Sequence, residues 1–243
     1  MAQFSERTLA WQLYLRAHGA RIACDGVYGP KTKAATAEMQ LDLGVQADGL
    51  LGPITIAAAR KAGFRPPSWP DKPDGAVPFN ATQRRKSFGA YAFVPAPTSD
   101  DPEAIRITDG WEEKNIVRVQ IPELANVKGA PKLGVPFHRL AAAQLKRLFS
   151  RWHDAGLVDR ILTWDGSFVP RMIRGRSSLS MHAYGAAFDI NCEFNPLGGR
   201  PALMYERGCV RELVEIAWQF GFYWGGWFSR RDGMHFEVNR ILE

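Results

Sequence analysis

The sequence has few cysteines, no long apolar run and no recognisable targeting segment. Its three cysteines, Cys24, Cys192 and Cys209, are odd in number and form no C-x-x-C pair, so we expect reduced thiols in a protein made in the cytosol. No stretch approaches the roughly 20 apolar residues of a membrane span, so stable membrane insertion is not expected. Residues 1–7 lack a basic segment followed by an apolar run, so a secretory signal is not expected either.

The composition is that of a folded globular protein. Hydrophobic residues make up 46% of the 243 residues and eight are tryptophan, which argues against disorder. The length fits one large domain or two smaller ones. The net charge of +6 favours an anionic partner without choosing among nucleic acid, membrane and bacterial wall. Because the basic residues are scattered and no recognition motif is present, nucleic acid is not the expected partner.

A turn motif occurs twice near the N-terminus. Residues 25–32 read DGVYGPKT, and residues 48–55 read DGLLGPIT. Asp-Gly makes a tight turn, and proline at the first helical position starts a helix without losing a hydrogen bond. Upstream, apolar residues at helical spacing predict another helix over residues 9–17. The pattern predicts an all-α domain of three short helices over residues 1–62.

A proline-rich stretch separates this region from the rest of the chain. Residues 63–78 hold five prolines and two glycines, a composition that sustains neither a helix nor a central strand. We therefore predict a semi-rigid linker there, followed by a second domain over residues 79–243.

The second domain mixes strands and helices in no regular order. Alternating apolar residues predict strands over residues 116–121 and 161–164. A strongly amphipathic helix is expected over residues 137–155, with His138 and His153 at its ends as surface or capping residues. Because no βαβ rhythm is present, the pattern predicts an α+β domain.

Two further stretches have unusual composition. The basic cluster at residues 84–86 is interpreted as a solvated surface. Residues 220–228 contain six aromatic residues and three glycines, which is typical of core or of a platform that stacks on a sugar or peptide. We favour the core interpretation.

Two separated stretches carry the residues best suited to chemistry. Residues 177–191 read SSLSMHAYGAAFDIN and contain His182 and Asp189, while residues 232–237 read DGMHFE and contain His235. Two imidazoles and one carboxylate suit a zinc ion that keeps a further position open for water.

Both stretches are predicted to include short strands. Alternation would place Asp189 and Asn191 on one strand face, whereas Cys192 would point the other way and is not expected to be a ligand. His235 and Glu237 lie two residues apart on the second strand, so both should face the site.

The first stretch follows the pattern S-x-H-x-x-G-x-A-x-D, and the second follows D-x-x-H. This pair resembles the D-alanyl-D-alanine carboxypeptidase and phage endopeptidase family of zinc peptidases. The resemblance implies a zinc ion held by His182, Asp189 and His235, with Asp232 as the general base that acts on the bound water. It also implies a small antiparallel sheet that carries the metal on one face. The alternative is that these are ordinary loop polar residues and a buried histidine.

The family has an arginine upstream of the S-x-H loop. Arg171 is the best match and Arg174 the second; either could stabilise the oxyanion that develops when an amide is attacked, or could instead bind substrate carboxylates or face solvent. Ser180, the motif serine, is expected to orient the loop or the substrate. It lacks a base and an orienting acid of its own, so a serine nucleophile is not expected.

The two repeated turns resemble the small three-helix peptidoglycan-binding module of wall hydrolases, although a helical bundle that merely packs on the rest remains an alternative. Together the resemblances imply a monomeric peptidoglycan hydrolase similar to a phage endolysin. Such a protein would stay in the host cytoplasm until released and then act on the cell wall or in the periplasm. The alternatives are a cellular carboxypeptidase that trims terminal D-Ala and a non-catalytic wall-binding protein.

Overall fold

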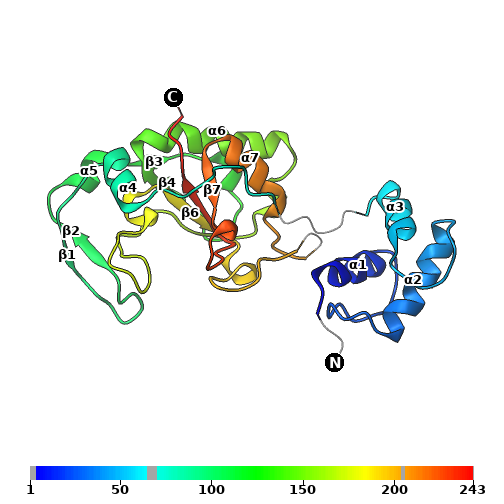
Figure 1. Cartoon of the computed structure of the whole chain (residues 1–243). Helices are drawn as coiled ribbons and strands as arrows, with labels where there is room; N and C mark the ends of the chain where they lie inside the picture. The colour runs from blue at the N-terminus through cyan, green and yellow to red at the C-terminus, as the bar shows by residue number, and fades with distance from the viewer. Residues whose placement is uncertain (1–3, 65–69, 204–205, 243) are drawn as a thin grey trace.

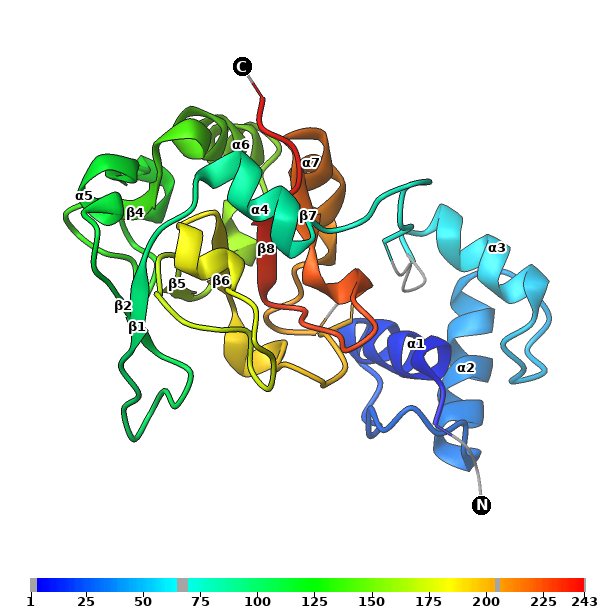
Figure 2. The same cartoon turned by 60° about the vertical axis from the view of Figure 1, so that its left-hand side comes forward.

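The computed structural model describes residues 4–64, 70–203 and 206–242 (Figure 1). The N-terminal part is helical, with a core that includes the buried rings of Trp11 and Phe64. Figure 2 shows its helices set apart from the sheet of the second domain. They are α1 (Glu6–Ala17), α2 (Pro30–Asp42) and α3 (Pro53–Lys61). The predicted three-helix domain is confirmed, and each repeated turn leads into a helix that starts with proline. In the described ranges, no helix is both long and apolar enough to cross a membrane.

Each repeated turn is closed by a buried glutamine from the helix before it. On α2, the Gln40 amide nitrogen donates to Asp48 Oδ1 at 2.8 Å, and its oxygen accepts from the Gly49 N–H at 2.7 Å. Gln12 on α1 makes the equivalent contacts with the first turn, including one to Asp25 Oδ1 at 2.9 Å. The sequence repeat therefore reflects two copies of one hydrogen-bonded unit. Each unit includes a glutamine that lies outside the repeated turn motif and was not predicted from it.

The second domain is built on a four-stranded antiparallel sheet, in agreement with the predicted α+β class. Its strand order is β5-β6-β8-β7. The register places Asp189 opposite His235. The strands are β5 (Trp164–Gly166), β6 (Ala187–Ile190), β7 (Phe222–Trp224) and β8 (His235–Val238).

Helices cover one face of this sheet (Figure 1). Phe188 of β6 stacks on Phe236 of β8 with ring centroids 5.3 Å apart, and Trp152 of the longest helix in this domain packs against both rings. Since side chains alternate along a strand, Asp189 and His235 project from the other face. The remaining elements are α4 (Ala81–Phe88), β1 (Phe93–Pro95), β2 (Ile105–Ile107), α5 (Trp111–Asn115), β3 (Ile116–Val119), β4 (Val135–His138), α6 (Ala142–Asp154) and α7 (Val214–Gln219), with 3₁₀ turns between several of them.

The predicted helix over residues 137–155 begins later than expected. Residues 135–138 form β4, which pairs with β3, and a 3₁₀ turn precedes α6. Leu140 is 41% exposed in that turn. His138 is fully buried, which corrects its assignment to the surface, although it does cap the turn by accepting from the Leu140 N–H. His153 is exposed. Strand pairing with a distant segment thus overrides the helical periodicity at this end.

Part of the predicted proline-rich linker contacts the second domain. Residues 65–69 lie outside the described residues, but the Trp227 indole N–H donates to the Pro70 carbonyl at 2.7 Å. The ammonium group of Lys72 lies 5.8 Å from the centroid of the Tyr223 ring. The chain after Pro70 is therefore held along the surface of the domain.

The N-terminal helices touch the second domain through charged side chains. Glu6 Oε2 on α1 lies 4.0 Å from Arg211 Nη1. The Arg200 guanidinium lies 5.8 Å from the centroid of the Phe4 ring. These contacts place α1 beside the segment that leads into α7.

Candidate metal centre and cleft

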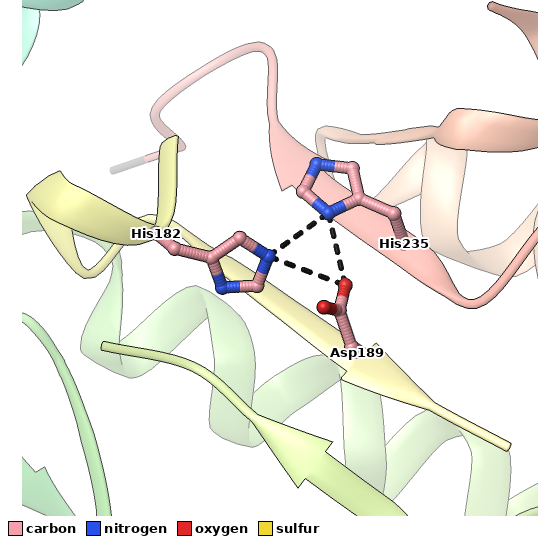
Figure 3. Close-up of side chains that lie close together, drawn as sticks. All are labelled: His182, Asp189 and His235. Carbon is pink, nitrogen blue, oxygen red and sulfur yellow. Dashed lines mark hydrogen bonds and ion pairs between the residues drawn. The ribbon is translucent and has the colours of Figure 1, made fainter. Parts of the chain in front are cut away.

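Three side chains converge on one point at the face of the sheet opposite the helices (Figure 3). Asp189 lies on β6, His235 lies opposite on β8, and His182 lies in the 3₁₀ turn Met181–Tyr184 that leads into β6. His182 Nε2 is 3.2 Å from Asp189 Oδ1 and 3.1 Å from His235 Nδ1. His235 Nδ1 is 2.9 Å from Asp189 Oδ1. The three donor atoms form a triangle about 3 Å on a side, which we call the donor triangle.

The outer partners of the two imidazoles fix which nitrogens face this triangle. His182 Nδ1 lies 2.8 Å from the Ser167 carbonyl, and His235 Nε2 lies 3.0 Å from Glu237 Oε2. Carbonyl and carboxylate oxygens accept hydrogen bonds, so these two ring nitrogens carry the protons. The other two nitrogens, His182 Nε2 and His235 Nδ1, therefore face each other and the Asp189 carboxylate, and both can direct lone pairs inward only when a cation lies between them. Because three electron-rich atoms this close require a positive charge between them, the residues present fit a metal ion.

The pKa values of these groups also indicate that the site favours a positive charge. Burial disfavours a charged His235, but its hydrogen bonds to Asp189 and Glu237 outweigh that cost and raise its pKa to about 10. Burial alone would raise the pKa of Asp189, yet the adjacent His182 and His235 hold it well below its usual range. The carboxylate is therefore ionised at neutral pH, as a metal ligand must be.

The turn that carries His182 depends on two small neighbours. Ser180 caps it, since its hydroxyl oxygen accepts from the His182 N–H at 3.2 Å. Gly185 ends it with φ +60°, and its carbonyl accepts from the His138 N–H at 2.7 Å. A Cβ at Gly185 would lie 2.6 Å from the Ile116 side chain. Glycine thus allows the close approach that seats the turn against β4.

Asp232 lies beside the donor triangle with an unsatisfied oxygen. Its Oδ1 is buried and has no hydrogen-bond partner among the described residues. Burial raises the pKa of this carboxyl; His235 acts in the opposite direction, and Asp189 raises the pKa further. A carboxylate with a raised pKa next to a metal-binding donor set is suited to take up and release a proton.

The triangle opens into a cleft of about 680 Å³. One wall is aromatic: Trp227 and Phe228 line it, and the Phe228 ring lies 5.8 Å from that of His235. The core interpretation of residues 220–228 therefore holds for Phe222, which is fully buried, while the end of the run forms part of the cleft.

The structure brings all the predicted site residues together. The cleft is lined by His182 and His235 of the donor triangle and also by Arg171, Arg174, Ser180 and Asp232. The charge of Arg171 is close enough to act on the pKa of Asp232, which fits a guanidinium next to the reacting groups. Their catalytic and binding roles stay predictions.

Not every cleft residue was predicted from the sequence. Arg84 of α4 is only partly exposed and lines the cleft, where its Nη1 donates to the Leu179 carbonyl at 2.8 Å. The interpretation of residues 84–86 as solvated surface is therefore wrong for this residue. No local signal marks it, because it is brought to the cleft by the packing of α4 on the turn that carries His182.

Comparison with family models agrees with this geometry. Residues 174–238 match the family of D-alanyl-D-alanine carboxypeptidases. The carboxypeptidase match spans the whole donor triangle and Asp232 and begins just after Arg171. Residues 5–59 match the putative peptidoglycan binding domain. No curated protein and no solved structure shows significant similarity to the chain.

The two matches confirm the architecture that the motifs predicted. A segment that matches the carboxypeptidase family follows a segment that matches the peptidoglycan binding domain in one chain. Together they support a peptidase that acts on peptidoglycan.

Proposed function

We propose that the protein is a peptidoglycan hydrolase of the endolysin type, which cleaves a peptide bond in the stem peptide or crosslink of the bacterial wall. The observation that carries this proposal is the donor triangle beside the unpaired Asp232 carboxylate. It lies within a carboxypeptidase-family segment and opens into a cleft large enough for a short peptide.

His182, Asp189 and His235 would hold a zinc ion at the donor triangle. When bound, zinc makes water acidic and polarises the peptide carbonyl. The protein supports this chemistry by fixing both imidazoles through Ser167 and Glu237. Such outer partners orient the ligands and favour the required tautomers.

Asp232 would act as the general base. It accepts a proton from the attacking water at its unpaired Oδ1 and passes this proton to the leaving amine. Arg171 would stabilise the negative charge that develops on the carbonyl oxygen. Arg174 is the second candidate for that role and otherwise binds substrate, while Ser180 holds the His182 turn in place and faces the substrate.

The N-terminal module would hold the enzyme on the wall. We propose domains at residues 1–62 and 79–243, joined by the linker at residues 63–78. Binding of the module raises the local concentration of substrate around the cleft without adding a catalytic contact. We expect a monomer that stays in the host cytoplasm until it is released to the cell wall or periplasm.

A cellular D,D-carboxypeptidase that trims terminal D-Ala is the second candidate, because the matching family carries that description. A non-catalytic wall-binding protein is the third, and the complete donor triangle counts against it. The products of purified sacculi, identified by mass spectrometry, distinguish the three. Cleavage of an internal stem or crosslink bond is expected. Release of free D-Ala alone would identify the carboxypeptidase, and no product from the zinc-loaded protein would leave only wall binding.

Metal analysis tests the ligand set directly. We expect one zinc per chain in the parent protein and a strongly reduced content in His182→Ala and His235→Ala. The control is His153→Ala, which removes an exposed histidine at the end of α6 and should leave the zinc content unchanged. Undiminished zinc in both ligand variants would refute the assignment.

A further inference from the structure

The cleft is strongly and unevenly charged. Of the described residues that line it, the only carboxylates are Asp232 and Glu237, both at the donor triangle. Cationic side chains reach it from several separate segments: Lys72, Arg84, Arg171, Arg174, Arg176 and Arg230. We call these six the cationic rim.

The cationic rim is not neutralised by the protein itself. None of its members has a carboxylate oxygen within 4.0 Å in the described part of the chain, where the arginine ion pairs involve Arg160, Arg200 and Arg211. Like charges gathered around a low-dielectric cleft produce a positive potential that concentrates anions. The hydrolysis of an uncharged peptide bond requires at most one or two of these cations.

The rim has an inner and an outer part. Arg84 and Arg171 are half-buried, while Lys72, Arg176 and Arg230 are exposed at the mouth of the cleft. Arg84 is held in place by its bond to the Leu179 carbonyl, yet its Nε–H is buried without an acceptor. A guanidinium fixed in this way at the cleft is suited to bind a carboxylate.

We propose that the cationic rim selects peptides that carry several free carboxylates near the scissile bond. In peptidoglycan this is the stem peptide whose D-Glu and diaminopimelate carboxyl groups are not amidated. The inference rests on the proposed function and adds a substrate requirement to it. It assigns carboxylate recognition to Lys72, Arg84, Arg176 and Arg230, beyond the arginines already placed next to the reaction.

The test compares two soluble stem peptides that differ only in having free carboxylates or carboxamides at these positions. Amidation removes the charge and keeps the size, so it isolates electrostatic recognition. With the zinc-loaded full chain, we expect kcat/KM to be at least about tenfold higher for the free acid, since one charge-assisted hydrogen bond contributes about that factor. This preference should shrink as salt is added, because exposed charges are screened.

Variants connect the preference to the rim. Arg176→Gln and Arg230→Gln should each lower kcat/KM several-fold more for the free acid than for the amidated peptide. The matched control is Arg106→Gln, which removes an exposed charge on β2 that does not line the cleft. As a second measurement, the zinc-loaded Asp232→Asn protein should bind the free acid about tenfold more tightly than the amide.

The outcomes separate the two proposals. If both peptides are cut at rates within about twofold, the inference is overturned while the hydrolase proposal stands. If neither peptide is cut by the zinc-loaded protein and Asp232→Asn binds both equally, the proposed function and the inference fail together. A preference that Arg106→Gln reduces as much as the rim variants do would reflect net charge and would also overturn the role of the rim.

Discussion

Acidification is expected to destabilise the second domain through His138. This imidazole is fully buried beneath α4, with the rings of Phe88 and Trp111 5.0 Å and 5.6 Å away. Its Nδ1 accepts from the Leu140 N–H, and its Nε2 faces the Phe88 carbonyl, each at 3.3 Å. Only the neutral ring with a proton on Nε2 satisfies both bonds. A second proton on Nδ1 would point at the Leu140 N–H and leave two donors facing each other without an acceptor. Burial is the main cause that lowers the pKa of His138, to about 4.

The sign and size of the effect follow from linkage. A histidine in the unfolded chain has a pKa near 6.5. Between pH 6.5 and 4, His138 therefore binds a proton in the unfolded chain but stays neutral in the folded protein. The contribution of neutral His138 is fully present above pH 6.5 and is lost as the pH falls toward 4. The loss is about 2 kcal/mol at pH 5 and about 3 kcal/mol at pH 4.

Urea denaturation at pH 7.5 and pH 5 measures this loss. His138→Asn removes the titration and keeps a side-chain acceptor for the Leu140 N–H; it will be less stable at pH 7.5 but should lose about 2 kcal/mol less than the parent on acidification. His153→Asn, which changes an exposed histidine, should behave like the parent. The donor triangle is common to all three proteins, so its own titration cancels. Equal losses in all three would refute the role of His138.

Further changes test the site, the linker and the repeat. Asp232→Asn should retain zinc while hydrolysis of sacculi falls at least about a thousandfold; activity within about tenfold of the parent would remove the general-base role and make Glu237 the next candidate. A chain shortened to start at Pro70 should lose binding to sacculi and still cut soluble muropeptides like the full chain. A chain that starts at Phe79 lacks Lys72 and Pro78 of the cleft wall, so its KM should rise several-fold; equal KM values would show that the segment is only a connector. Gln40→Ala leaves the Gly49 N–H without its acceptor and should destabilise the N-terminal module by about 2–4 kcal/mol in thermal unfolding. The control Gln46→Ala, at an exposed position, should leave the stability unchanged.

The donor triangle was predictable from the sequence because its ligand residues occur at a characteristic spacing within two short motifs. Alternation along β6 and β8 puts Asp189, His235 and Glu237 on one face and leaves the opposite side chains for the core. The prediction was less accurate where the strand ended. Asn191 adopts φ +56° and leaves the strand, and its side-chain oxygen accepts from the Leu162 N–H. A period of two gives the face of a residue but not the point at which the strand stops.

The remaining features depend on contacts between distant segments. The pairing of β4 with β3 overrides the helical pattern around His138, and the packing of α4 carries Arg84 into the cleft. The bond from Trp227 to Pro70 turns part of a proline-rich stretch into a wall of the site. Local composition contains none of this information, because each case is decided by a partner more than twelve residues away.

The anchoring of Pro70 has a consequence for movement on the wall. Phe64 is buried in the N-terminal core, and Pro70 is fixed to Trp227, so the chain between these two points spans at most about 20 Å even when fully extended. Even if the contact between Glu6 and Arg211 opens, a molecule held by its N-terminal module can sample only bonds close to its own footprint. To hydrolyse bonds over a larger area, the module must dissociate from the wall and bind again elsewhere. The dissociation rate of the N-terminal module, rather than its affinity for the wall, should therefore limit how much wall one molecule degrades.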